Sequence, residues 1–477
     1  MQKKVEENKK MLSIRFLILF LLIFSTQNLF SESIIFGNSK EYAKSTIHFY
    51  KYEDRITYKK DSIFSLKFDA DGNFSTEVNI NSITFVFAEF GIYYAYFYLE
   101  PNSKYELILP EYLEKENKDI FNPFFEAQQL HLGIKNMEKS DLNYLIMDLN
   151  YYYDRFLSLK YEDLYTAKDF SEAEEFIKNI NEKYKNEKND YFVQYKRYKI
   201  ATLKHLVTKG QLASDLVFSY YSKNKVLYDN PAYMDLFNVL YYSYFDQMLV
   251  SEQGATLYSI INKGHSIRRL NIFLSQKKEL QNTQLREMVI MKGLYDCFSN
   301  KNISWLPLLL TLDSLNISTK YPQHKIISQN IADAVIELAP YTIAPNFYLQ
   351  DTANIEYSLK DFKGKYVYLQ FANTTSVPSQ QELELLKKLY EKFYGDCIFV
   401  TILTDSDKDK AKKFIRRYKL KWTFLFTDDN SKTISDYQVA VYPTYFLITP
   451  EGFLKMSPAP SPSENIEKYI LNILKEK

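Results

Sequence analysis

The chain has 477 residues, more than one ordinary hydrophobic core accommodates, which suggests about three domains. Its 60 basic and 59 acidic residues nearly balance, and no run of basic residues occurs. This argues against a protein that is held to nucleic acid mainly by phosphate contacts. Aromatic residues are abundant, with 42 Tyr and 35 Phe, and can fill several cores.

Residues 1–33 have the pattern of a signal peptide, with basic residues ahead of the uninterrupted apolar stretch 16–24. This stretch is too short to cross about 30 Å of hydrocarbon as a helix. We expect export and a mature chain that begins near Ile34, and an uncleaved N-terminal anchor is the alternative. Met1 and Met11 both suit as the first residue. No cysteine lies near the cleavage region, which disfavours a lipoprotein, and no later stretch reaches the ~20 apolar residues of a membrane-spanning helix.

The chain contains only two cysteines, Cys297 and Cys397, although an exported protein can form disulfides. Neither belongs to a local redox motif. Cys397 opens the apolar run 397–400, which is typical of a buried strand. We therefore expect both thiols to be buried structural groups, and a disulfide between them is the alternative.

Residues 34–111 alternate short aromatic and β-branched runs with turn residues, a pattern that predicts a small β-sandwich. Residues 69–73 (Asp-Ala-Asp-Gly-Asn) and 100–103 (Glu-Pro-Asn-Ser) supply two of the turns. These turns resemble those of the β module that precedes thioredoxin-like domains in many envelope proteins of the Bacteroidota.

Residues 112–340 change to a helical period and are predicted to form a helical domain. One apolar helix face is marked by Leu142, Leu145, Ile146, Leu149 and Tyr153. No repeat at a fixed spacing occurs, so a solenoid is not supported. We expect the tyrosine-rich faces of this domain to form core and not a platform for a ligand.

Residues 341–477 carry an ordered series of motifs. The series comprises Ala-Pro-Asn-Phe at 344–347, an alternating strand at 366–371, Val-Tyr-Pro-Thr at 441–444, Pro-Glu-Gly at 450–452 and a closing helix at 466–474. This series resembles the TlpA/ResA and AhpC/TSA branch of the thioredoxin superfamily. The resemblance implies an α/β thioredoxin-like domain over these residues.

In that family, the first central strand leads into Trp-Cys-Pro-Pro-Cys and then a long helix. Here the resemblance places Ser376 and Ser379 at the two cysteine positions, with Val377 and Pro378 between them and Thr375 at the tryptophan position. The two positions that carry redox sulfur in the family therefore carry hydroxyl groups in this chain.

The resemblance also implies a cis proline at Pro443, flanked by Tyr442 and Thr444 and facing the start of the long helix. In such a site, the backbone beside the proline can pair with an extended peptide. Together with Thr375, these residues form the expected peptide-binding groove.

Disulfide exchange requires a thiolate, so Ser376 and Ser379 cannot perform it, and peroxidase chemistry fails for the same reason. A serine nucleophile needs a positioned base, but the last histidine, His324, lies upstream of the domain. We expect Ser376 to cap the long helix, and Ser379 with Glu382 also matches a capping box.

The remaining candidate ligands for a metal are scattered, and no Gly-rich phosphate loop occurs. No two of the five histidines have metal-ligand spacing: His48, His131, His205, His265 and His324. We expect no catalytic residue, metal site or cofactor.

These observations favour a redox-inactive thioredoxin-like protein of the periplasm or cell envelope that acts in protein binding or scaffolding. The expected partner is an envelope protein or peptide that the sequence does not identify. The alternative is an enzyme: a TlpA/ResA-type thiol-disulfide oxidoreductase, a protein that uses Cys397 or Cys297, or a hydrolase.

Overall fold

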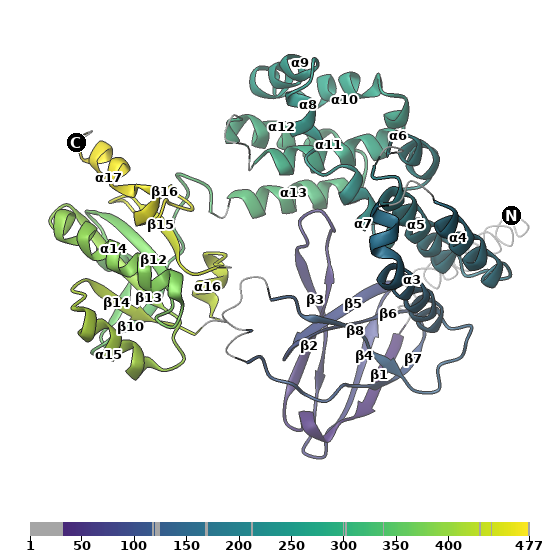
Figure 1. Ribbon diagram of the computed structural model, residues 1–477, viewed down its shortest axis with the longest axis horizontal. Helices are drawn as coiled ribbons and strands as arrows, with labels where there is room; N and C mark the ends of the chain where they lie inside the picture. The colour runs from purple at the N-terminus through teal and green to yellow at the C-terminus, as the bar shows by residue number, and fades with distance from the viewer. Residues whose placement is uncertain are drawn as a thin grey trace, which may run out of the picture. The chain divides into compact units, whose positions relative to one another are not determined.

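The computed structural model describes residues 32–116, 119, 125–166, 170–210, 213–298, 300, 303–336, 338–428, 431–439 and 441–475, with the backbone alone at 161–166 (Figure 1). The predicted targeting segment lies outside these residues except for Glu32 and Ser33. The chain forms two compact units. Unit 1 comprises the residues up to 114 with 127–220 and 225–237, and unit 2 comprises 115–126, 221–224 and 238–477.

The strands of unit 1 form two sheets, with the orders β4-β1-β7-β9 and β3-β2-β5-β6-β8. Apolar side chains of both sheets share one core, which includes Ile35, Phe49, Phe97 and Leu107. This arrangement confirms the predicted β-sandwich. The strands are β1 (Glu32–Asn38), β2 (Thr46–Tyr52), β3 (Lys60–Lys67), β4 (Asn73–Asn79), β5 (Thr84–Phe90), β6 (Tyr93–Leu99), β7 (Lys104–Ile108), β8 (Gln128–His131) and β9 (Gly133–Ile134).

The β region extends beyond residue 111, the boundary that the sequence pattern predicted. Strand β8 pairs in parallel with β6, and β9 pairs with β7. Both strands were assigned to the helical domain because they are short and lack the apolar alternation of a half-buried strand. The helices that follow are α3 (Leu142–Thr166), α4 (Ser171–Lys183), α5 (Asp190–Val207), α6 (Ala213–Leu216) and α7 (Pro231–Leu240).

Helix α3 starts at Leu142 and buries the five apolar residues that predicted it. It is tied to the sheet by Asn143, whose side chain accepts a hydrogen bond from the Tyr98 N–H and donates one to the Tyr98 carbonyl, both at 2.7 Å. Because Asn143 is buried, this two-way pairing satisfies its amide and fixes α3 against β6.

The helical part of unit 2 packs around α11, which is buried along most of its length and contacts α8, α10, α12 and α13. These helices are α8 (Tyr244–Leu249), α9 (Gly254–Ser259), α10 (Ile267–Ser275), α11 (Thr283–Cys297), α12 (Trp305–Ser318) and α13 (Pro322–Ile336). Short 3₁₀ and π segments in the chain are Lys40–Tyr42, Val217–Ser222, Ile260–Gly264, Lys278–Leu280, Leu359–Phe362 and Pro462–Glu464. Within the described ranges, no helix combines the length and apolar character needed to cross a membrane.

The C-terminal part of unit 2 is a sheet with the order β11-β10-β14-β13-β12-β15-β16 (Figure 1). Helices α14, α15 and α17 contribute to the core on one face, and α16 contributes to the core on the other. The elements are β10 (Tyr348–Asp351), β11 (Glu356–Ser358), β12 (Tyr366–Ala372), α14 (Val377–Phe393), β13 (Cys397–Leu403), α15 (Lys408–Tyr418), β14 (Thr423–Phe426), α16 (Lys432–Asp436), β15 (Thr444–Ile448), β16 (Leu454–Met456) and α17 (Ile466–Lys475).

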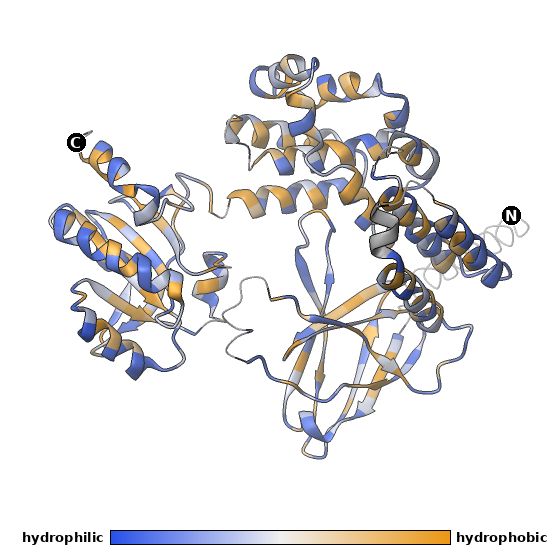
Figure 2. Ribbon diagram, in the orientation of Figure 1, coloured by the Kyte–Doolittle hydropathy of each residue, from blue (hydrophilic) through white to orange (hydrophobic). Residues whose placement is uncertain are grey.

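The central strands are apolar and α14 is amphipathic, as the hydropathy colouring shows (Figure 2). Strand β12 pairs in parallel with β13 and antiparallel with β15, so it lies in the middle of the sheet. A polar chain crosses its buried core: Trp422 donates to Thr401, Thr401 donates to Gln370, and Gln370 donates to Tyr445, at 2.8–2.9 Å. Each of these polar groups thus has a partner, as burial requires.

Candidate functional site

The loop from Asn373 to Ser376 follows the carboxyl end of the central strand β12 and leads into α14. In open α/β sheets, this end of the strands is where ligands bind. Asn373 is fully buried, and its side-chain oxygen accepts hydrogen bonds from the Thr375 N–H at 2.9 Å and the Thr375 hydroxyl at 2.7 Å. These hydrogen bonds stabilise the turn that precedes the helix.

Thr374 and Asp405 join the loop to the end of β13. The Asp405 carboxylate is 4% exposed and accepts the Thr374 N–H at 3.0 and 3.1 Å as well as the Thr374 hydroxyl. Burial raises the pKa of Asp405, although the hydrogen bonds from Thr374 act in the opposite direction. Sequence reasoning missed this pair. The available signal was the position of Asp405 just after the apolar strand 397–403, at the same sheet edge as the loop.

Ser376 occupies the residue before α14, and its carbonyl accepts the Gln380 N–H at 3.0 Å. The expected side-chain cap is wrong, because the Ser376 hydroxyl makes no capping hydrogen bond. The expected capping box of Ser379 and Glu382 is also wrong. Ser379 already lies within the first turn of α14, and the Glu382 carboxylate instead binds Ser463.

The two serines have different surroundings. Ser376 is half-buried, whereas Ser379 is fully buried, and its oxygen lies 3.4 Å from the Asn373 N–H that it accepts. The residues between them face solvent, with Val377 62% exposed and Pro378 also exposed. Thr375 is exposed as well.

Tyr442, Pro443 and Thr444 lie beside this loop. Thr444 opens β15 and pairs with Phe371 of β12, so continuing the antiparallel register by one residue places Pro443 next to Ala372. The Tyr442–Pro443 peptide bond is cis. The preceding Val441 is 45% exposed. Thus Thr375, Val377 and Val441 present exposed side chains at the sheet edge that carries the serines; we call this surface the α14 edge.

Neither cysteine forms a disulfide, and both are buried. Cys397 pairs with Tyr366 at the start of β12, whereas Ser376 follows the opposite end of that strand. The six residue-to-residue steps along β12 separate Cys397 from the α14 edge by about 20 Å at ~3.3 Å per step. Cys297 lies in the helical part of unit 2. Its pKa is raised mainly by burial and further by the nearby carboxylates of Asp246 and Asp296. A raised pKa makes the thiolate scarce at neutral pH.

The histidines form no common site. His324 is fully buried and contacts Glu287 at 2.7 Å between its Nδ1 atom and the carboxylate. Among the described residues, no group of three or more His, Cys, Asp or Glu side chains is placed to hold a metal ion.

A central sheet with parallel and antiparallel neighbours, flanked by helices and carrying a helix start at its carboxyl edge, defines a thioredoxin-like domain. Residues 341–457 match the AhpC/TSA family. The ResA thiol-disulfide oxidoreductase of Bacillus thuringiensis subsp. konkukian (strain 97-27) is 33% identical over 132 residues, which cover 27% of this chain and 76% of the relative. The chain therefore belongs to the TlpA/ResA-like family of the thioredoxin superfamily.

Other similar proteins match a comparable share of the chain. The thioredoxin-like protein YneN of Bacillus subtilis (strain 168) is 32% identical over 114 residues, covering 24% of this chain and 66% of the relative. The solution structure of a thiol:disulfide interchange protein from a Bacteroides species is 26% identical with a TM-score of 0.27, covering 28% of this chain and 92% of that one.

Proposed function

We propose that this protein is exported to the cell envelope and that its thioredoxin-like domain is redox-inactive and binds an extended segment of another protein at the α14 edge. The observation that carries the proposal is the chemistry of Ser376 and Ser379. They stand where the family resemblance places the redox cysteines, and they contain no sulfur. Without a thiolate, a mixed disulfide cannot form at this site. We therefore propose that the site binds its partner non-covalently.

The surface around Ser376 suits this role. Val377 and Val441 expose apolar side chains that a partner would bury. Residues 441–443 precede β15 and lie outside its ladder with β12, and the Val441 carbonyl accepts the Thr444 hydroxyl at 2.6 Å. We expect an extended peptide to align along this segment by strand addition. A peptide would gain backbone hydrogen bonds there and apolar contact on either side.

A thiol-disulfide oxidoreductase is the second candidate, because that is the activity in the names of the relatives. It would have to use Cys397 or Cys297. Cys397 is buried about 20 Å from the α14 edge, and the Cys297 thiol has a raised pKa. Neither arrangement gives an accessible thiolate, which is why we place this candidate second.

A photo-crosslinking amino acid tests the binding proposal in cells. It is placed at Val377 on the α14 edge and, as a matched control, at Tyr394, which is 67% exposed at the far end of the same helix. We expect a discrete protein adduct from position 377 that disappears with Thr375→Arg, and none from 394. Adducts of equal yield from both positions would contradict the proposal that the α14 edge is the binding surface.

A disulfide-reduction assay on purified protein tests the second candidate. We expect a rate at background. Turnover that is lost in Cys397→Ala or Cys297→Ala would replace our proposal with the oxidoreductase.

A further inference from the structure

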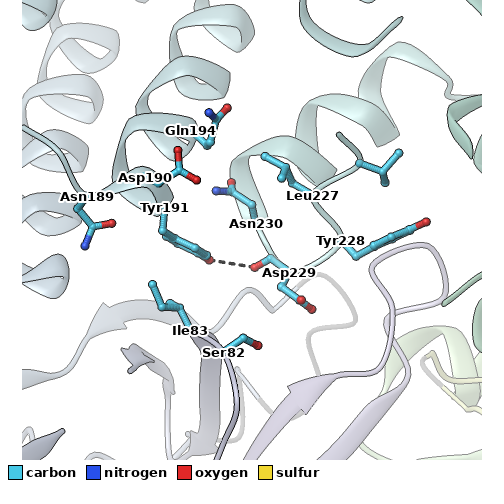
Figure 3. A pocket seen from close by; sticks show the side chains of 11 residues that line it. Ser82, Ile83, Asn189, Asp190, Tyr191, Gln194, Leu227, Tyr228, Asp229 and Asn230 are labelled. Atoms are coloured by element: carbon cyan, nitrogen blue, oxygen red, sulfur yellow. Dashed lines mark hydrogen bonds between the residues drawn. The ribbon is translucent and has the colours of Figure 1, made fainter. Parts of the chain in front are cut away.

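Unit 1 contains a cavity of about 570 Å³ that the proposed function does not use. It lies where the β4–β5 connection, the start of α5 and the segment before α7 meet (Figure 3). All of its lining residues belong to unit 1. The volume falls within the range of small-molecule sites, roughly 300–1,000 Å³.

Two asparagines that cap helices stand in its wall. The Asn189 side chain accepts the Phe192 N–H at 3.1 Å at the start of α5, and the Asn230 side-chain oxygen accepts the Tyr233 N–H at 3.3 Å at the start of α7. Asn230 is only 3% exposed, and its amide nitrogen has no hydrogen-bond partner. Figure 3 shows that nitrogen on the side of Asn230 that faces the side chains of α5. A buried donor without a partner is unfavourable, so an acceptor that reaches it gains affinity.

The charged residues that line the cavity restrict the class of ligand that can bind there. Asp190 and Asp229 line the cavity, and no Lys, Arg or His is among its lining residues, which disfavours an anion. The two carboxylates stand at the N-termini of α5 and α7, whose partial positive charge offsets them in part. The balance favours a neutral ligand that both donates hydrogen bonds to carboxylates and accepts one from Asn230.

The cavity also offers flat apolar surface. Tyr191 donates its hydroxyl to the Asp229 carbonyl at 2.9 Å, which fixes its ring as part of the wall. Leu227 and Ile83 add apolar contacts. Amide and carboxylate groups beside an aromatic ring match a sugar, which has hydroxyls that donate and accept and a face of C–H groups that packs on a ring. We propose that this cavity binds a neutral mono- or disaccharide, with Asn230 as its hydrogen-bond donor.

In the structure described here the Asn230 amide is covered, so binding requires a small side-chain adjustment at the base of the cavity. Changes of side-chain rotamer on binding are common. The substitution Asn230→Asp retains the oxygen that caps α7 and removes the amide donor. Asn282→Asp is the matched control, because Asn282 caps α11 in unit 2 in the same way, by accepting the Gln284 and Leu285 N–H groups.

Saturation-transfer NMR and calorimetry on the full chain without its N-terminal segment test the proposal, with glucose, maltose, cellobiose and lactose as neutral probes and spermidine and citrate as charged probes. We expect at least one neutral saccharide to bind with a dissociation constant on the order of 1 mM or below. Asn230→Asp should weaken that binding by about tenfold, Leu227→Trp should abolish it by filling the cavity, and Asn282→Asp should leave it unchanged.

Three results would overturn the proposal: no saturable binding of any of the saccharides, binding of a charged probe in their place, or unchanged saccharide binding in both cavity variants. Circular dichroism of each variant separates loss of binding from loss of fold. Because the cavity lies in unit 1, none of these results bears on the α14 edge of unit 2.

Discussion

The Asp405 carboxylate at the end of β13 holds the backbone and side chain of Thr374 in the loop before α14. This contact fixes the loop from which Thr375 and Ser376 project, although neither Asp405 nor Thr374 occupies a position of the family's redox motif. Asp405 is thus a positioning residue for the α14 edge.

Asp405 should make the stability of the C-terminal domain depend on pH. Burial raises its folded-state pKa above the unfolded value, so the folded domain binds this proton more tightly. Its contribution is therefore greatest at low pH and declines as the pH rises from the ordinary aspartate pKa through the raised one. Asp405→Asn should remove this decline, and Asp405→Ala should cost about 1–3 kcal/mol by leaving the Thr374 donors unpaired. Urea unfolding across pH measures both effects; parallel pH curves for wild type and Asp405→Asn would contradict the first.

Ser376→Cys combined with Ser379→Cys should produce a disulfide under mild oxidation. The two positions are three residues apart at the start of α14, where helix geometry places the Cα atoms about 5 Å apart, within the roughly 4.4–6.8 Å that a disulfide needs. Thiol titration and intact mass before and after oxidation measure the bond. The single variants serve as controls and should retain free thiols. A double variant that remains reduced would show that Ser376 and Ser379 do not occupy the redox positions.

Glu287 should stabilise the helical part of unit 2 in a pH-dependent way. Burial alone would raise the pKa of Glu287, but hydrogen bonds with His324 and Thr319 outweigh it and lower the pKa. A lowered folded-state pKa adds stability above the ordinary glutamate pKa, and this stability is lost as the pH falls through the folded value. Glu287→Gln should therefore cost about 1.5–3 kcal/mol at neutral pH and less in acid. The exposed Glu252→Gln is the control for thermal and urea unfolding, and an equal effect of the two substitutions would refute this role.

The mature N-terminus should lie before Glu32, slightly upstream of the Ile34 that the sequence pattern suggested. Strand β1 begins at Glu32, and Ser33 is fully buried with its hydroxyl donating to the Glu100 carbonyl at 2.7 Å. A chain that began at Ile34 would lack this contact. N-terminal sequencing of the exported protein locates the cut, and retention of residues 16–24 would instead indicate an anchored protein.

The sequence determined the elements whose signals are local. The apolar period from Leu142 predicted α3, because helix periodicity is carried by neighbouring residues. The motifs from residue 344 onward predicted the thioredoxin-like domain through their resemblance to a known family. The absence of sulfur at Ser376 and Ser379 is likewise a property of the sequence alone.

The tertiary structure decided what depends on residues distant in the chain. Strands β8 and β9 form by pairing with β6 and β7, respectively. Their own residues have little of the alternating apolar pattern that predicts a strand. The hydroxyl of Ser379 faces inward because α14 starts two residues before it, not at the capping box that the local pattern suggested. Thr374 contacts Asp405, and Asn230 lines the same cavity as the start of α5. In both cases, packing brings together segments that are separated by some thirty residues or more in the sequence. Such contacts form only when the whole domain buries its apolar surface. A short stretch of sequence therefore cannot predict them.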